Sequence, residues 1–140
     1  MKKIISSAVI ILAAIMFLTA ADSFAQSAPK VKVTLAKKSY KPGQTGTLII
    51  KFIHGSDVKI PKEPEIEVSL TGVSGVGLQP VGGGEYITSS QVKYNFTVPS
   101  DAQSNSQITI TGSVKFGYCN SETGVCKLGN KSFTVKLKVK

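Results

Sequence analysis

Cys119 and Cys126 are the two residues of this 140-residue chain whose type and spacing could do chemistry. Six residues separate them, and asparagine, serine, threonine and glycine in that segment are typical of a loop on which the chain folds back. The chain has two cysteines and no third, so a single intramolecular disulfide is the only internal pairing it can form.

Such a disulfide could brace the structure or exchange electrons. Closing an eight-residue ring removes about 2.5 kcal/mol of unfolded-chain entropy, a modest gain for residues that a hairpin already holds close. At the tip of a hairpin the sulfurs should be open to an attacking thiolate, which suits exchange. The spacing alone leaves the structural and the redox roles both open.

A metal site is the weaker third reading of the cysteine pair. His54 is the one histidine of the chain, and both methionines, Met1 and Met16, lie near its N-terminus. Two cysteines and one histidine cannot complete a four-ligand zinc site without help from a carboxylate. We therefore expect no metal and no cofactor, and we expect His54 to be a turn residue after a strand that ends near Phe52.

The segment Gly82-Gly83-Gly84-Glu85-Tyr86 is the other candidate functional element. Three consecutive glycines make a mobile backbone, and the aromatic side chain behind them could cover an apolar group. The segment is either a flexible turn that leads into the next strand or a lid over the disulfide.

The N-terminus has the pattern of a secretory signal peptide. Lys2 and Lys3 precede the apolar run 4–18, and the small residues around Phe24 predict cleavage after Ala25. The apolar run is shorter than the roughly 20 residues that a spanning helix needs. We therefore expect a signal peptide at 1–25 and one exported domain at 26–140, soluble in the periplasm or otherwise outside the cytoplasm, where disulfides persist.

The charge of the chain is strongly positive. All 17 basic residues are lysines, and the formal net charge is +9. Removing the signal peptide takes away two lysines and Asp22, which lowers the charge from +9 to +8. Because arginine, the bidentate reader of phosphates and bases, is absent and the lysines look dispersed, we expect no nucleic-acid binding. Solubility, or steering towards an acidic partner, explains the charge better.

Hydrophobic residues alternate with polar ones at period two along most of the chain, as in half-buried strands. The expected strands are 31–35, 48–52, 65–70, 92–98, 108–116 and 133–140. Lys41-Pro42-Gly43-Gln44 has the proline and glycine positions of a type II turn. The pattern predicts an all-β fold, an antiparallel β-sandwich of immunoglobulin type, with a small closed barrel as the alternative.

Two features separate the chain from antibody domains. Tryptophan is absent, and the two cysteines lie too close in sequence to form the bridge between the two sheets of such a domain. The disulfide must therefore have another purpose.

The order of motifs resembles the N-terminal periplasmic domain of DsbD, the transmembrane thiol–disulfide reductant conductor of bacterial envelopes. The resemblance covers the whole of 26–140 and includes Tyr40-Lys41-Pro42-Gly43 before a long strand, a strand that ends in Pro99, and Phe116-Gly117-Tyr118-Cys119. A second cysteine and a last strand follow. The family often has proline soon after the second cysteine, where this chain has Lys127-Leu128-Gly129.

The resemblance implies an immunoglobulin-like fold in which Cys119 and Cys126 are the redox pair. A thioredoxin-like protein would reduce the disulfide, and the dithiol would reduce periplasmic oxidoreductases that serve disulfide isomerisation and cytochrome c biogenesis. A cap loop, placed by position at Gly82 to Tyr86 with Glu85 and Tyr86 as its contacts, would shield the pair. The membrane conduit and thioredoxin domain of that family are absent from this sequence, so electrons would come from a separate protein. The alternative is a non-catalytic envelope-binding module with a structural hairpin disulfide.

Overall fold

The computed structural model describes residues 27–140, which form nine strands and no helix. The predicted signal peptide at 1–25 lies outside the described residues. Within the described range, no helix is long and apolar enough to cross a membrane.

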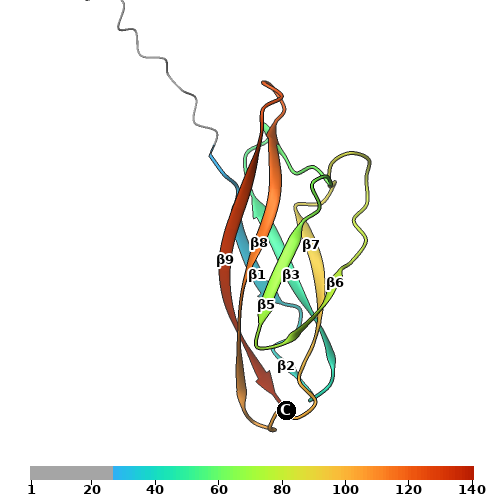
Figure 1. The fold of residues 1–140 in the computed structure, drawn as a ribbon, viewed down its shortest axis with the longest axis vertical. Helices are drawn as coiled ribbons and strands as arrows, with labels where there is room; N and C mark the ends of the chain where they lie inside the picture. The colour runs from blue at the N-terminus through green and yellow to red at the C-terminus, as the bar shows by residue number, and fades with distance from the viewer. Residues whose placement is uncertain (1–26) are drawn as a thin grey trace, which may run out of the picture.

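The strands form two packed sheets (Figure 1). One sheet has the order β1-β3-β7-β6; the other has the order β2-β9-β8-β4, and β5 also pairs with β8. In chain order the strands are β1 (Lys30–Leu35), β2 (Ser39–Tyr40), β3 (Thr45–Ile53), β4 (Val58–Lys59), β5 (Glu67–Thr71), β6 (Ser74–Leu78), β7 (Gln91–Thr97), β8 (Gln107–Asn120) and β9 (Cys126–Val139). The predicted all-β sandwich is confirmed at this level, with two distinct sheets in place of one closed barrel.

One pairing departs from the purely antiparallel prediction. Ser39 and Tyr40 of β2 pair in parallel with Lys138 and Val139 of β9. The chain leaves β1 and crosses to the second sheet without reversing, because the reversal comes later, at the turn 41–44. The strand β2 therefore keeps the direction of β1 and meets the last strand in parallel.

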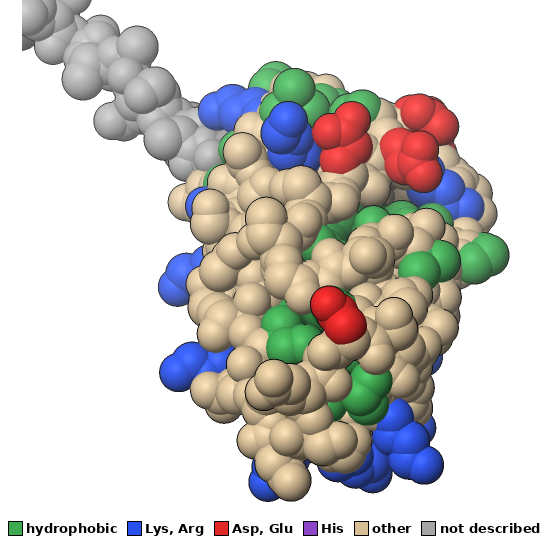
Figure 2. Space-filling view, turned by 60° about the horizontal axis from the view of Figure 1, so that its bottom comes forward, with side chains coloured by type: hydrophobic (Ala, Val, Ile, Leu, Met, Phe, Trp, Pro, Cys, Tyr) green, Lys and Arg blue, Asp and Glu red, His purple; other side chains and the backbone are tan. Residues whose placement is uncertain are grey.

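The core lies between the sheets and has two clusters, one towards each end of the sandwich. The cluster nearer the tip of the β8–β9 hairpin centres on Phe52 and Phe116, whose rings pack edge to face with centroids 5.0 Å apart. The other cluster includes Tyr40 and Phe96, with ring centroids 5.6 Å apart. Figure 2 shows one face of the surface, on which lysines are spread around the edge and hydrophobic side chains appear in small patches.

The hairpin of β8 and β9 is the longest element, with 14 residues in each strand. It pairs in continuous register from Gln107 opposite Lys138 to Cys119 opposite Cys126. Along β8, Phe116 and Tyr118 point into the core, so the residues between and beyond them face the outer side of the sheet. This alternation places Cys119 on the outer face.

Candidate disulfide site

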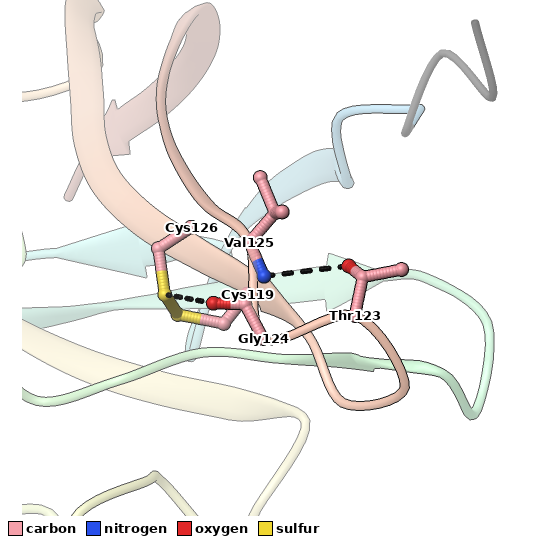
Figure 3. Close-up of a disulfide and its surroundings, with 5 residues drawn as sticks. All are labelled: Cys119, Thr123, Gly124, Val125 and Cys126. Carbon is pink, nitrogen blue, oxygen red and sulfur yellow. Dashed lines mark hydrogen bonds between the residues drawn. A yellow bond between two sulfur atoms is a disulfide. The ribbon is translucent and has the colours of Figure 1, made fainter.

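Cys119 and Cys126 form a disulfide at the loop end of the β8–β9 hairpin (Figure 3). Their sulfurs are bonded at 2.06 Å, and their Cα atoms lie 4.0 Å apart as directly opposed residues. Just beyond them, the N–H of Asn120 donates to the carbonyl of Val125 at 2.9 Å. The cysteines therefore occupy a non-hydrogen-bonded pair, the position at which opposed side chains of antiparallel strands come closest.

The loop between the cysteines closes through Asn120. Its side-chain oxygen accepts the N–H groups of Glu122 and Thr123, each at 2.9 Å, as in an Asx turn. Its carbonyl accepts the N–H of Gly124 at 2.9 Å, and this glycine adopts a φ of +71°, which glycine tolerates without strain. These hydrogen bonds close the turn without involving either sulfur.

A second set of contacts ties the same loop to the segment before β4. The carbonyl of Asp57 accepts both the N–H of Ser121, at 2.7 Å, and its hydroxyl, at 3.1 Å. The side-chain amide of Asn120 donates to the Asp57 carboxylate at 3.3 Å. The tip of the hairpin is thus held by the chain that precedes β4 as well as by its own turn.

The two cysteines differ sharply in exposure. Cys119 is only 5% exposed although it faces the outer side of its sheet, whereas Cys126 is exposed. The expectation that both sulfurs would be open at a hairpin tip is therefore wrong for Cys119. On this face of β8, the remote residues Pro61 and Pro64 approach the neighbouring Gly117.

The disulfide borders a groove of about 760 Å³. Its walls are the proline-containing connection after β4, the segment after the glycine run, and the ends of β8 and β9. The lining residues are Pro61, Lys62, Glu63, Pro64, Gly84, Glu85, Tyr86, Gly117, Cys119, Cys126, Lys127 and Leu128. Two lysines and two glutamates are among them, so the charge of the lining is balanced.

The predicted cap residues, Glu85 and Tyr86, both line this groove together with the two cysteines. Backbone pairing holds them there: Lys62 N–H donates to the carbonyl of Glu85 at 2.9 Å, and Tyr86 forms a bridge with Pro61. The ammonium of Lys59 lies 5.5 Å from the centre of the Tyr86 ring, within the range of a cation–π contact. That these residues shield the disulfide from thiols stays a prediction.

The wall formed by Pro61 and Pro64 was not anticipated as part of the site. Gly117 explains how the prolines reach the disulfide, because a Cβ at this position would lie 3.2 Å from Pro61 and 3.3 Å from Pro64. The glycine of Phe116-Gly117-Tyr118-Cys119 was the sequence signal for this close approach. Its meaning depends on a connection more than fifty residues earlier in the chain.

His54 lies exposed just after β3, with its Nδ1 2.8 Å from the carbonyl oxygen of Gly55. It lies in the loop that follows β3, as its expected position after the strand implies, and the turn itself is at 56–57. Residues 27–140 contain no group of three or more His, Cys, Asp or Glu side chains placed to hold a metal ion.

The fold and the site define a β-sandwich protein with a cross-strand disulfide at the edge of a groove. No protein-family model matches the chain, and no curated protein matches it. Among solved structures, it is similar to the crystal structure of Spo0M, a sporulation control protein from Bacillus subtilis, with 18% sequence identity and a TM-score of 0.41. The match covers 81% of this chain and 50% of the other, and it assigns neither a family nor a function.

Proposed function

We propose that the Cys119–Cys126 disulfide performs thiol–disulfide exchange in the bacterial envelope. It would accept electrons from a thioredoxin-like protein and pass them to other exported oxidoreductases. The observation that carries this proposal is an exposed Cys126 at a groove large enough to receive another protein's loop. A purely structural bridge needs neither an exposed cysteine nor the groove.

The difference in exposure supports one order of exchange. A partner thiolate attacks the sulfur of the exposed Cys126, a new disulfide forms between the two proteins, and Cys119 leaves as a thiolate that takes up a proton. The partner's second thiolate then attacks the sulfur of the partner's first cysteine in that mixed disulfide and releases Cys126 as a thiolate, which also takes up a proton. Two electrons and two protons pass to this chain, and the partner becomes oxidised. Reduction of a client runs through the same steps in reverse.

The hairpin is suited to both redox states. The turn at Asn120 and the contacts with Asp57 do not include the sulfurs, so reduction leaves these hydrogen bonds in place. The reduced protein therefore keeps the two thiols opposite each other, ready to close again. A relay requires this property, because each cycle must return the pair to the same geometry.

Apolar side chains provide a docking surface beside the disulfide. Val125 is 50% exposed and Leu128 is 77% exposed, on either side of Cys126 in the sequence. Ile53, which is 48% exposed, ends β3 at the same end of the sandwich. Exposed apolar groups near a reactive centre are typical of protein contact surfaces. A docked partner with an activated thiolate would make an internal base unnecessary.

The strand order supports the finer part of the proposal, an immunoglobulin-like fold of the kind found in the N-terminal domain of DsbD. The strands of immunoglobulin domains are lettered A to G in chain order. If β1 and β2 are both counted as A and β4 and β5 both as C, then β3, β6, β7, β8 and β9 are B, D, E, F and G. The two sheets then have the orders A-B-E-D and G-F-C. The chain would then be an exported relative of that domain.

Single-cysteine variants test the assignment of the attacked sulfur. The probe is a thioredoxin whose one remaining cysteine carries a thionitrobenzoate leaving group, so that each exchange releases a coloured thiolate. We expect Cys119→Ala, which keeps the exposed Cys126, to form the mixed disulfide rapidly. The matched variant Cys126→Ala, which keeps the buried Cys119, should react slowly. Equal rates, or no adduct from Cys119→Ala, would contradict the proposal.

A hairpin brace in a non-catalytic binding module is the second candidate, and the burial of Cys119 favours it. The reduction potential separates the two functions. Catalytic disulfides lie between about −120 and −270 mV, whereas structural ones lie below about −300 mV. Equilibration in glutathione and dithiothreitol buffers, followed by alkylation and mass spectrometry, measures the midpoint. A value in the structural range would select the brace.

A further inference from the structure

The end of the sandwich opposite the disulfide carries a cluster of exposed lysines. Two lie in the crossing from β1 to β2, one opens the turn after β2, and three lie near the C-terminus. They are Lys37, Lys38, Lys41, Lys136, Lys138 and Lys140, and all six are exposed. We refer to them as the lysine end.

Pairing between β2 and β9 brings these remote segments together. Lys138 N–H donates to the carbonyl of Lys38 at 3.3 Å, and Lys140 N–H donates to the carbonyl of Tyr40 at 3.0 Å. The side chains of Lys38, Lys136 and Lys138 line a shared hollow of about 480 Å³. The lysines that look dispersed in the sequence are therefore gathered in the structure.

The acidic residues do not balance this end. Among the described residues, Asp101 is the one acid in the loops and strand ends beside the lysine end. The other acids lie in the segment 57–67, in the loop at Glu85 and at the hairpin tip. Figure 2 turns the lysine end towards the viewer and shows blue side chains along its lower edge, with red ones mainly above. The positive charge is therefore least balanced by acidic residues at the lysine end.

We propose that the lysine end binds the surface of an anionic phospholipid bilayer, without insertion. Lysine is a compact, hydrated point charge, and clusters of lysines outside a bilayer are attracted by anionic headgroups. None of the exposed large hydrophobic residues of the described chain, Ile53, Val76, Val125 and Leu128, belongs to the segments that carry the six lysines. Half-buried Val33, Leu35 and Val135 also line the hollow, but the side chains that project from this end are those of the lysines.

A nucleic acid fits this end less well. Single-stranded nucleic acids bind proteins through aromatic side chains on which the bases stack. The aromatic residue nearest these lysines in sequence, Tyr40, is 2% exposed and belongs to the core. Arginine is absent from the chain. A diffuse anionic surface, which asks only for accessible positive charge, matches the lysine end best.

Binding in this way would orient the molecule. The hairpin tip with Cys126 lies at the opposite end of the long axis from the C-terminus (Figure 1). A molecule held by its lysine end would present the disulfide away from the lipid. The lipid contact itself does not require the disulfide to be redox-active, so the two proposals fail independently.

Vesicle sedimentation tests the proposal with two charge-matched variants. Lys38→Gln/Lys136→Gln/Lys138→Gln removes three charges from the lysine end. Lys32→Gln/Lys51→Gln/Lys93→Gln removes three exposed lysines from the outer face of the other sheet. Each lysine near an anionic bilayer contributes about a fivefold change in partition, so the first variant should lose roughly 100-fold. The second variant should lose much less.

The vesicles are phosphatidylcholine alone and phosphatidylcholine with phosphatidylglycerol. We expect wild-type binding to the anionic vesicles only, and release when the salt concentration is raised, because salt screens the attraction. Equal losses in the two variants, or wild-type binding to neutral vesicles, would overturn the proposal. So would loss of oligonucleotide binding in the first variant with vesicle binding retained. Circular dichroism of both variants confirms that each is folded.

Discussion

The stability difference between the oxidised and the reduced protein is a sharp test of the disulfide's role. The bridge joins residues seven positions apart, so the ring contains eight residues. Constraining a ring of this size in the unfolded chain stabilises the native state by about 2.5 kcal/mol, if the native hairpin is the same with and without the bond. The structure supports that condition, because the turn at Asn120 closes through its own hydrogen bonds.

We therefore expect the reduced protein to remain folded and to lose about 2.5 kcal/mol or less of its free energy of unfolding. Urea unfolding followed by circular dichroism, with and without reductant, measures the difference. The urea concentration at the midpoint of unfolding should fall. The slope of the unfolding free energy against urea concentration should rise only modestly, because reduction loosens the unfolded chain and leaves the native state unchanged. Cys119→Ser/Cys126→Ser should behave as the reduced protein does, which controls for effects of the reductant.

Asn120→Ala, compared in the oxidised and the reduced protein, tests whether the turn at Asn120 closes the hairpin without the disulfide. In the oxidised protein the bond still closes the hairpin, so the loss of the Asn120 side-chain hydrogen bonds should cost about 1–2 kcal/mol. In the reduced protein no disulfide holds the hairpin in place of these hydrogen bonds, so Asn120→Ala should lower the free energy of unfolding by more. If reduction alone unfolds the wild-type protein, or removes well over 4 kcal/mol, the hairpin depends on its disulfide. The argument that exchange leaves the fold intact would then be refuted.

Three further outcomes follow from the exposure and the packing. In the reduced protein, iodoacetamide should modify Cys126 before Cys119, as read by peptide mass spectrometry, and the reverse order would contradict the exposure difference. Phe52→Ala should lower the free energy of unfolding by about 3–5 kcal/mol, because its ring is 1% exposed in the core; a loss under about 1 kcal/mol would contradict this packing. Gly46→Ala should cost about 1–3 kcal/mol in urea unfolding, since the added Cβ would lie 2.3 Å from the Phe96 ring; an unchanged stability would contradict that close approach.

Local patterns were sufficient to predict the long strands. Period-two alternation located β3 and β7, and those parts of β8 and β9 that were expected at 108–116 and 133–140; both strands continue beyond these bounds, to Asn120 and from Cys126. The inward-facing parity of residues such as Leu48 and Phe116 agrees with their burial. The turn at 41–44 was also predicted: Gly43 has a φ of +72°, and Gln44 N–H donates to the carbonyl of Lys41 at 3.1 Å. These features depend on residues that are neighbours in the sequence, so the sequence displays them directly.

Short strands gave no such signal. The two-residue strands β2 and β4 are too brief for any period to be visible, although each adds a strand to the second sheet. The strand β6, which contains Gly75 and Gly77, was not among the expected strands. One of them, Gly75, lies against Tyr94, where a Cβ would come within 2.5 Å of the phenol oxygen. Its small size serves packing within the sheet, and packing against a strand twenty residues later has no local signature.

The same distinction explains which parts of the candidate site could be predicted. The pairing of Cys119 with Cys126 follows from their proximity in the sequence and the loop-forming residues between them. The burial of Cys119 does not, because it depends on segments remote in sequence, such as those of Pro61 and Tyr86, which line the same groove. The residues of the segment 82–86 left a flexible turn and a lid over the disulfide both open, and the choice of Glu85 and Tyr86 as cap contacts came from a family resemblance.

The unequal exposure of the two sulfurs has a consequence for selectivity. A small thiol can reach Cys126 from solvent and form a mixed disulfide with it. The freed thiol of the buried Cys119 is then the nucleophile nearest to that mixed disulfide. Its attack on Cys126 restores the original disulfide and expels the small thiol. A protein partner escapes this reversal if its own second thiol completes the exchange while its docked loop occupies the groove. The ratio of the reduction rates by a dithiol protein and by glutathione should therefore be high in the wild type. It should fall in Tyr86→Ala, where one wall of the groove is removed, and an unchanged ratio would show that the groove plays no part in choosing the reductant.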